Sequence, residues 1–134
     1  MAQSPGLEWR FPDRSLVSMY QAADIYAFPS LMETFGMVQL EAMAAGAAVV
    51  STDAPGCRDV VIHEQNGLQA HAGDVDSFTV QLGRLLEDSA LREDLSAKGK
   101  AWVQDYSWSN VANQYEAVFT ALINDHRSAG STHD

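Results

Sequence analysis

Residues 25–52 read IYAFPSLMETFGMVQLEAMAAGAAVVST, and this stretch decides the fold. It begins with a short apolar segment, 25–28, which Pro29 ends, and it closes with a β-branched segment, 48–51. Both segments are typical of buried strands. Residues 36–46 between them predict a helix that ends at Gly46. Strand, helix and strand in succession indicate an α/β protein with a parallel sheet and flanking helices.

The flanking sequence adds one strand and several helices. Apolar residues at helical spacing predict a helix over 13–23, with Asp13 as its cap. The turn Asn66-Gly67 predicts a brief strand over 68–70 after it. Three further helices are expected after residue 74, the last of them capped by Ser109 and carrying an apolar stripe. About three strands result, where a doubly wound nucleotide fold usually has about six, so we expect a partial Rossmann-like sheet followed by C-terminal helices.

Composition limits the classes of function. The chain has 134 residues, room for one domain, with a loop expected over 1–12, the domain over 13–126 and a disordered tail over 127–134. Its net charge of −10 argues against nucleic acid and against anionic lipid as partners. A single cysteine, Cys57, excludes an internal disulfide. The sequence shows neither a signal peptide nor a transmembrane segment, so the expected location is the cytoplasm.

The turn after the first strand, residues 29–36, is the first candidate binding element. Ligands of open parallel sheets bind beyond the carboxyl ends of the strands. Gly36 allows close backbone approach, and the free N–H groups at a helix start attract phosphate. By itself such a turn is a weak signal. Glu33 lies in it, and from position alone a solvated loop carboxylate is the favoured interpretation.

Glu41 is the second candidate. At about 100° per residue it falls between Met37 and Val38, inside the apolar arc of the helix, while Gln39 and Ala42 take the opposite side. A carboxylate in an apolar arc needs hydrogen-bond donors to offset its desolvation. Ribose hydroxyls are suitable donors, and so are backbone N–H groups or a buried arginine. Helix position alone does not choose between them.

A family resemblance connects these residues. The stretch Pro29-Ser30-x-x-Glu33-x-Phe35-Gly36-Met37-x-x-x-Glu41-Ala42-Met43-Ala44-Ala45-Gly46 resembles the E-x7-E signature of the group-1 (family 4) retaining glycosyltransferases of GT-B fold. The segments around it, 20–24, 49–52, 66–68 and 106–108, are also similar to the family. The likeness runs from about residue 16 to 123. The turn at 55–59 departs from it, with Pro55-Gly56-Cys57 in place of a Gly-Gly turn.

The resemblance implies a donor site for a nucleotide sugar. By it, Glu33 is the catalytic candidate and contacts hydroxyls of the transferred sugar, and Glu41 holds the ribose hydroxyls. The amides around Phe35, Gly36 and Met37 meet the sugar and its diphosphate, with Val38 beside the phosphate and ribose. No cofactor and no metal are implied, because the nucleotide sugar is a substrate. The acceptor is unknown, and an N-terminal acceptor-binding domain is expected outside this chain.

Two alternatives remain beside this interpretation. A partial sheet has an exposed edge, so the chain is alternatively a binding remnant that lacks catalysis and forms homo-oligomers through that edge. A metal centre is the weaker alternative, because the spacing of His63, His71, His126 and His133 fits no known ligand pattern. The P-loop, the Rossmann glycine fingerprint and the Gly-x-Ser-x-Gly elbow are absent from the sequence.

Overall fold

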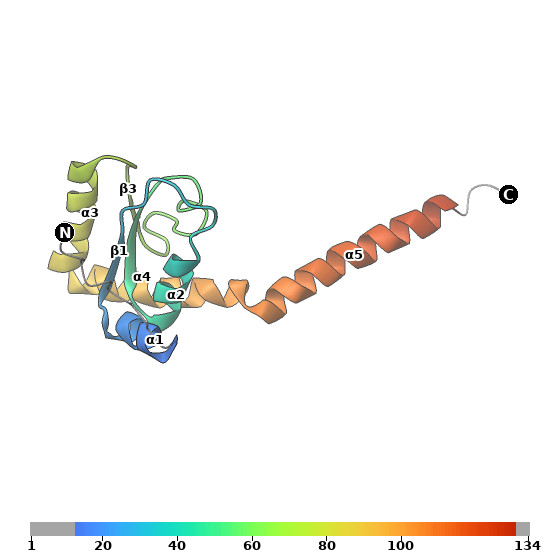
Figure 1. The fold of residues 1–134 in the computed structure, drawn as a ribbon, viewed down its shortest axis with the longest axis horizontal. Coiled ribbons are helices and arrows are strands. Elements are labelled where there is room, and N and C mark those ends of the chain that lie inside the picture. Colours follow the sequence, from blue (N-terminus) through green and yellow to red (C-terminus); the bar gives the residue numbers. More distant parts are fainter. Residues whose placement is uncertain (1–12, 131–134) are drawn as a thin grey trace, which may run out of the picture. The chain divides into compact units, whose positions relative to one another are not determined.

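Three short strands and their helices make up residues 13–130, which the computed structural model describes; side chains are described for 15–126. The elements are, in order, α1 (Asp13–Ala22), β1 (Ile25–Phe28), α2 (Met37–Ala45), β2 (Ala48–Thr52), β3 (Leu68–Ala70), α3 (Val75–Glu87), α4 (Ser89–Trp102), the 3-10 helix η1 (Val103–Tyr106) and α5 (Trp108–Gly130) (Figure 1). They form two units, the first ending at Ala101 and the second beginning at Trp102.

The sheet of the first unit is parallel, with β2 between β1 and β3. The registers are Ile25↔Ala48 through Phe28↔Ser51 and Val50↔Leu68 through Thr52↔Ala70. All five residues of β2 are buried, as expected for the central strand of a parallel sheet with both faces covered. The predicted α/β class, with a partial parallel sheet and flanking helices, is confirmed.

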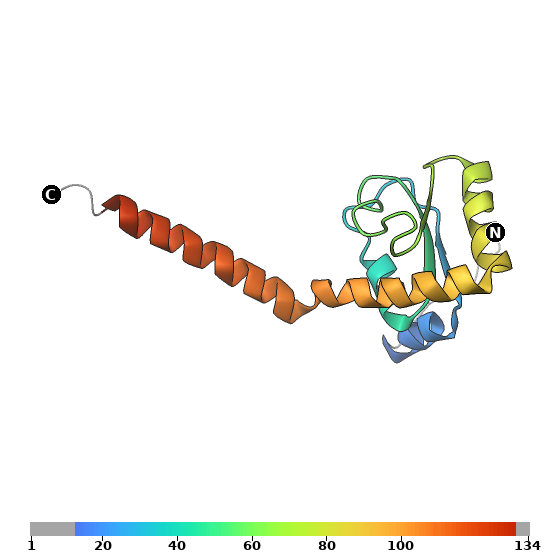
Figure 2. The same cartoon turned by 180° about the vertical axis from the view of Figure 1, so that it is seen from behind.

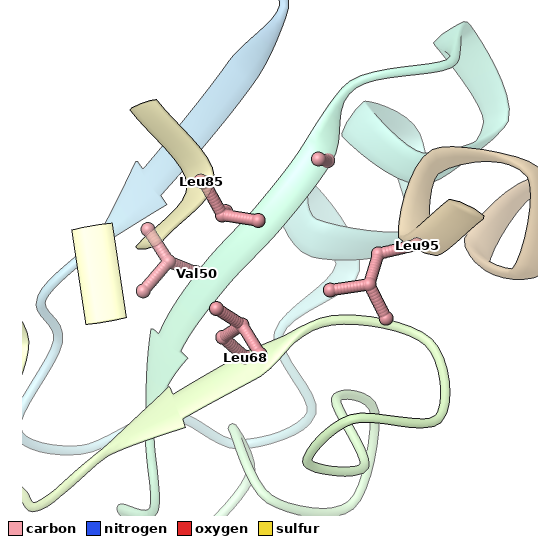
Figure 3. Close-up of a cluster of buried hydrophobic side chains, with 5 residues drawn as sticks. Val50, Leu68, Leu85 and Leu95 are labelled. Carbon is pink, nitrogen blue, oxygen red and sulfur yellow. The ribbon is translucent and has the colours of Figure 1, made fainter. Parts of the chain in front are cut away.

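One face of the sheet carries the main apolar cluster. Its fully buried members come from β2, β3, α3 and α4: Ala48, Val50, Leu68, Leu85 and Leu95. Figure 3 shows Leu85 and Leu95 reaching from their helices toward Val50 and Leu68 on the strands. Helix α4 crosses the first unit on the side that faces the reader in Figure 2. Helix α2 contacts β1 and β2, and it follows β1 after the loop of residues 29–36.

The helix boundaries are close to the predicted ones, with one correction. Helix α2 lies between Gly36 and Gly46, as expected. Helix α3 is capped by Asp74, whose carboxylate accepts a hydrogen bond from the Ser77 N–H at 2.9 Å. Helix α5 begins at Trp108, and the Asn110 N–H donates to Ser107 Oγ at 3.3 Å. The capping serine is therefore Ser107, and the prediction of Ser109 was wrong.

The second unit consists of η1 and α5. The predicted apolar stripe lies on α5, and five of its residues are exposed: Tyr115, Val118, Phe119, Leu122 and Ile123. Helix α5 continues through residues 127–130, which were predicted to belong to a tail. Residues 1–12 and 131–134, for which a loop and the rest of that tail were predicted, lie outside the described residues. Among the described helices, none has the length and apolar character to cross a membrane.

Gly83 is expected to be a site of easy stabilisation. It lies inside α3, and a Cβ added there meets nothing within 4 Å. Because glycine is a poor helix former, Gly83→Ala is expected to raise the free energy of unfolding by about 0.5–1 kcal/mol in a urea titration. Gly99→Ala in α4 is the control, since its Cβ would lie 3.1 Å from Met43 Cγ and 3.2 Å from Asn66 O. Equal gains for the two variants would show that the crowding at Gly99 has no effect.

Candidate functional site

Two loops meet beyond the carboxyl ends of β1 and β2. The Glu33 N–H donates to the Pro55 carbonyl oxygen at 3.1 Å. A Cβ added to Gly56 would lie 2.2 Å from the Glu33 carbonyl oxygen, so the two main chains touch at this point. The Thr52 hydroxyl also donates to the Ser30 carbonyl oxygen. The loop that carries Glu33 is thus held in place by the loop that follows β2.

Helix α2 begins at Gly36, directly after that contact. Gly36 has a left-handed backbone, with φ 71° and ψ 42°, and the helix start has no side-chain cap. A Cβ at Gly36 would also collide with the Gln39 side chain at 2.1 Å. The left-handed backbone therefore favours glycine at this turn. The Gln39 N–H donates to the Gly36 carbonyl oxygen at 2.9 Å, and the other N–H groups of this uncapped helix start suit an anion such as phosphate.

The six predicted site residues form one continuous stretch from this loop into α2. Gly36 is buried, Glu33 and Val38 are half-buried, and the others, Phe35, Met37 and Glu41, are exposed. The two carboxylates act on the same ring. Burial raises the pKa of Tyr26, a hydrogen bond with Tyr20 lowers it, and the negative charges of Glu41 and Glu33 raise it further. Both carboxylates thus lie close enough to Tyr26 to raise its pKa.

The predicted orientation of α2 was wrong. Gln39 and Ala42, expected on the wet side, are fully buried together with Leu40 and Met43, whereas Glu41 is exposed. Apart from Gln39 and Glu41 every residue of this helix, MVQLEAMAA, is apolar. Apolar side chains on all sides give the sequence no preferred face, so packing against β1 and β2 decides it. Because Glu41 is exposed, its carboxylate needs no buried donors and is accessible to a ligand.

Tyr20 is a neighbour of Glu41 that the sequence did not indicate as a site residue. Its hydroxyl donates to Glu41 Oε2 at 3.4 Å across the contact between α1 and α2. Burial first, and then the Tyr26 and Glu41 side chains, raise the pKa of Tyr20 to about 12. A hollow of about 440 Å³ opens beside this pair, lined by Leu16, Val17, Tyr20, Gln21, Glu41, Ala44 and Ala45.

The comparison with known families decides the identity of this arrangement. The sequence profile of the family described as "Glycosyl transferases group 1" matches residues 8–102. The chain belongs to the group 1 glycosyltransferases. The match covers the whole of β1, α2, β2 and β3, and thus the full stretch from Glu33 to Glu41.

Relatives of this group 1 glycosyltransferase chain are found among sequences and structures. D-inositol 3-phosphate glycosyltransferase of Corynebacterium urealyticum is 38% identical over 111 residues, 83% of this chain and 26% of the relative. The C-terminal domain of the group 1 glycosyltransferase LpcC of Francisella tularensis is 30% identical with a TM-score of 0.64, over 71% of this chain and 49% of that one. HepE of Anabaena in complex with UDP is 25% identical with a TM-score of 0.71, over 77% and 29%.

These comparisons also locate the chain within the fold. It spans about a quarter of the length of the curated relatives it matches. Its parallel sheet with flanking helices corresponds to the C-terminal domain of the GT-B fold, as the LpcC domain shows. The predicted family and fold are therefore confirmed for this group 1 glycosyltransferase chain. The roles of Glu33, Phe35, Gly36, Met37, Val38 and Glu41 are not tested by these comparisons and remain predictions.

A polar clasp joins the ends of β2 and β3 in this group 1 glycosyltransferase chain. Asp53 Oδ2 lies 2.9 Å from His71 Nδ1, and the Ala72 N–H donates to Asp53 Oδ1 at 2.8 Å. The hydrogen bond to His71, then the Ala72 N–H, lower the pKa of Asp53. The Asp53 carboxylate, first by its hydrogen bond and then by its charge, raises the pKa of His71. The clasp fixes the start of the segment that leads into α3.

The clasp gives stability a defined pH dependence. The raised pKa of His71 stabilises the fold below 6.5, and this contribution is lost as the pH rises through that pKa. The lowered pKa of Asp53 stabilises the fold above 3.8, and this is lost as the pH falls through that pKa. Both contributions to stability are fully present between pH 3.8 and pH 6.5. In an NMR titration Asp53→Asn is expected to lower the pKa of His71 toward 6.5, and Asp59→Asn to leave it unchanged; equal effects would contradict the assignment.

Proposed function

We propose that this chain binds a nucleotide sugar and supplies the donor site of a sugar transfer that retains the anomeric configuration. One observation carries the proposal: the start of α2, at Gly36, lies between Glu33 and Glu41 at the carboxyl edge of a parallel sheet. This edge is where open α/β sheets bind ligands. Helix N–H groups suit the diphosphate, and carboxylates suit hydroxyls.

Each predicted residue then has a chemical task. Glu41, exposed on the second turn of α2, accepts hydrogen bonds from the ribose hydroxyls. Glu33, in the loop before the helix, accepts hydrogen bonds from hydroxyls of the transferred sugar. The backbone amides around Phe35, Gly36 and Met37 meet the sugar and its diphosphate, and Val38 packs beside the phosphate and ribose. The turn at Gly36 allows this approach because it carries no side chain.

The position of the α2 start also suits the chemistry of sugar transfer. When the bond between the anomeric carbon and the diphosphate oxygen breaks, its electron pair leaves with the diphosphate, and the sugar passes through an oxocarbenium-like state. The growing negative charge lies at the positive end of α2, which stabilises it. The anomeric carbon then forms its new bond to a hydroxyl oxygen of the acceptor, and the hydroxyl proton passes to the released diphosphate. Glu33 holds the sugar in position during this exchange.

The relatives support the assignment of donor binding to this chain and of acceptor binding to other sequence. The HepE structure holds UDP, a nucleoside diphosphate. Because the chain matches about a quarter of its curated relatives, acceptor binding is assigned to sequence outside these residues. We therefore expect the 134 residues alone to bind the donor without transferring its sugar.

A calorimetric titration tests donor binding directly. The chain is titrated with UDP-glucose, GDP-mannose and ADP-glucose in turn, with glucose alone as the control. Saturable one-to-one binding of a nucleotide sugar, and none of glucose, is the expected result. If none of the three gives heat above dilution, the proposed donor site is wrong for this chain. Sugar transfer by the chain alone would contradict the proposal that acceptor binding needs sequence outside these residues, but it would not contradict donor binding.

A second candidate function is self-association through the sheet edge. Among the described strands β1 is paired only with β2, so the hydrogen-bonding groups of its other edge are open to a further strand. Exposed Leu16, Val17 and Met19 on α1 add apolar surface to the first unit. Sedimentation velocity over a hundredfold range of concentration separates the two candidates. A dimer that Ala27→Lys on this strand dissociates would support pairing at β1, and a monomer at every concentration would exclude it.

A further inference from the structure

Gln39 is the most unusual polar residue near the donor site. It lies on α2 and is fully buried, with an exposed fraction of 0%. Neither its carboxamide oxygen nor its carboxamide nitrogen has a hydrogen-bond partner among the described residues. A buried amide without partners costs free energy that a leucine or methionine of similar shape would not. The unliganded protein therefore carries a destabilising group at this position.

The Gln39 amide lies beside the loops that form the proposed donor site. A Cβ built on Gly36 would lie 2.1 Å from Gln39 Nε2 and 3.4 Å from the Gly56 carbonyl oxygen. The amide thus lies directly against the turn that starts α2, on the side where the loop of Gly56 approaches. Gln39 is the third residue of α2, and its own N–H donates to the Gly36 carbonyl oxygen at 2.9 Å. Its unpaired atoms adjoin the two loops that form the site.

We propose that Gln39 is a positioning residue whose amide completes its hydrogen bonds when a nucleoside diphosphate sugar binds at the start of α2. The diphosphate draws the Gly36 turn toward it, and the amide then pairs with main-chain groups of that turn and of the Gly56 loop. The acceptor for Nε2 in this proposal is the Gly56 carbonyl oxygen, which lies 3.4 Å from the same built Cβ position on Gly36. This inference rests on the proposed function. It adds that donor binding removes the cost of a buried unpaired amide, which couples affinity to the state of Gln39.

The coupling makes an unusual pair of predictions for Gln39→Met, which keeps the length of the side chain and removes the amide. The melting temperature of the unliganded protein is expected to rise by roughly 3–6 °C, because an unpaired buried amide is gone. The Kd for the nucleotide sugar that the wild type binds is expected to rise about tenfold, because the bonds formed on binding are lost. A residue that only supports the fold would not raise stability and weaken binding together.

Asn66 provides the matched control. It is also a buried amide, but it is paired: Ile62 N–H donates to its Oδ1 at 2.7 Å, and its Nδ2 donates to the Val60 carbonyl oxygen at 3.0 Å. Asn66→Leu is expected to lower the melting temperature, because it leaves those main-chain groups without partners. Opposite shifts for the two variants identify Gln39 as the unpaired amide.

Calorimetry and thermal unfolding together separate the outcomes. Failure of the wild type to bind UDP-glucose, GDP-mannose or ADP-glucose overturns the proposed function, and the role of Gln39 with it. If the wild type binds, a fall in melting temperature of Gln39→Met, or an unchanged Kd, overturns the role of Gln39 alone. Should the variant not fold, NMR of the wild type decides: the side-chain NH₂ signals of Gln39 are expected to shift on donor binding while those of Asn66 stay in place. Unmoved Gln39 signals reject the proposal.

Discussion

Gly56→Ala is expected to destabilise the protein by about 4 kcal/mol, from the combined cost of a left-handed alanine and of main-chain overpacking. Gly56 has φ 80°, and its added Cβ would lie 2.2 Å from the Glu33 carbonyl oxygen and 2.6 Å from the carbonyl carbon. Both atoms belong to the main chain, so a side-chain rotation cannot relieve the contact. The loops must separate, which also breaks the hydrogen bond from the Glu33 N–H to Pro55.

Gly73→Ala is the matched control for this prediction. Gly73 has nearly the same φ, 82°, but a Cβ added there meets nothing within 4 Å. It therefore carries only the conformational cost, about 1 kcal/mol. Urea titrations of the wild type and the two variants measure the difference. Equal losses for Gly56→Ala and Gly73→Ala would show that the two loops are not packed against each other as described.

Glu41→Ala is expected to weaken nucleotide-sugar binding by about a hundredfold, since it removes hydrogen bonds from ribose hydroxyls to a charged acceptor. The fold should hardly change, because Glu41 is exposed and its Tyr20 hydrogen bond is long, at 3.4 Å. Calorimetry with the nucleotide sugar that the wild type binds gives the affinity, and thermal unfolding gives the stability. A loss of affinity without a loss of stability assigns Glu41 to the ligand.

Glu87→Ala controls for charge. Glu87 is exposed at the end of α3, so its replacement changes the net charge by the same amount without touching the site. If Glu41→Ala binds the nucleotide sugar as tightly as Glu87→Ala does, Glu41 does not contact the ribose. Loss of affinity in both variants would instead show a general effect of charge on an anionic ligand.

The elements of the sheet were predictable because their signals are local. Pro29 ends β1 and Gly46 ends α2, and the apolar runs before and after them have the length of buried strands. The candidate site was predictable as a stretch of sequence for the same reason, since residues 33–41 are consecutive. The helix cap at Ser107 was missed because three neighbouring positions, 107–109, read Ser-Trp-Ser and offer two candidate caps.

The packing around the site was not predictable from local sequence. The face of α2 depends on contacts with β1 and β2, and its apolar residues left Gln39 and Glu41 equally open to burial. Tyr20 and Tyr26 meet the site from earlier elements, and no spacing in the sequence links them to Glu41. The contact of Gly56 with Glu33 joins positions on two loops, and only the folded chain brings them together.

That contact between loops has a consequence for engineering sugar preference. The Glu33 main chain rests on Pro55 and Gly56, so the direction of its carboxylate is set by a segment that itself carries none of the predicted donor contacts. The same loop approaches the Gly36 turn, since the Gly56 carbonyl oxygen lies 3.4 Å from a Cβ built on Gly36, so changes in residues 55–59 act on Glu33 and on the helix start together. A library directed at this short turn, with Gly56 kept, is therefore expected to vary the Glu33 end of the donor site more than the Glu41 end.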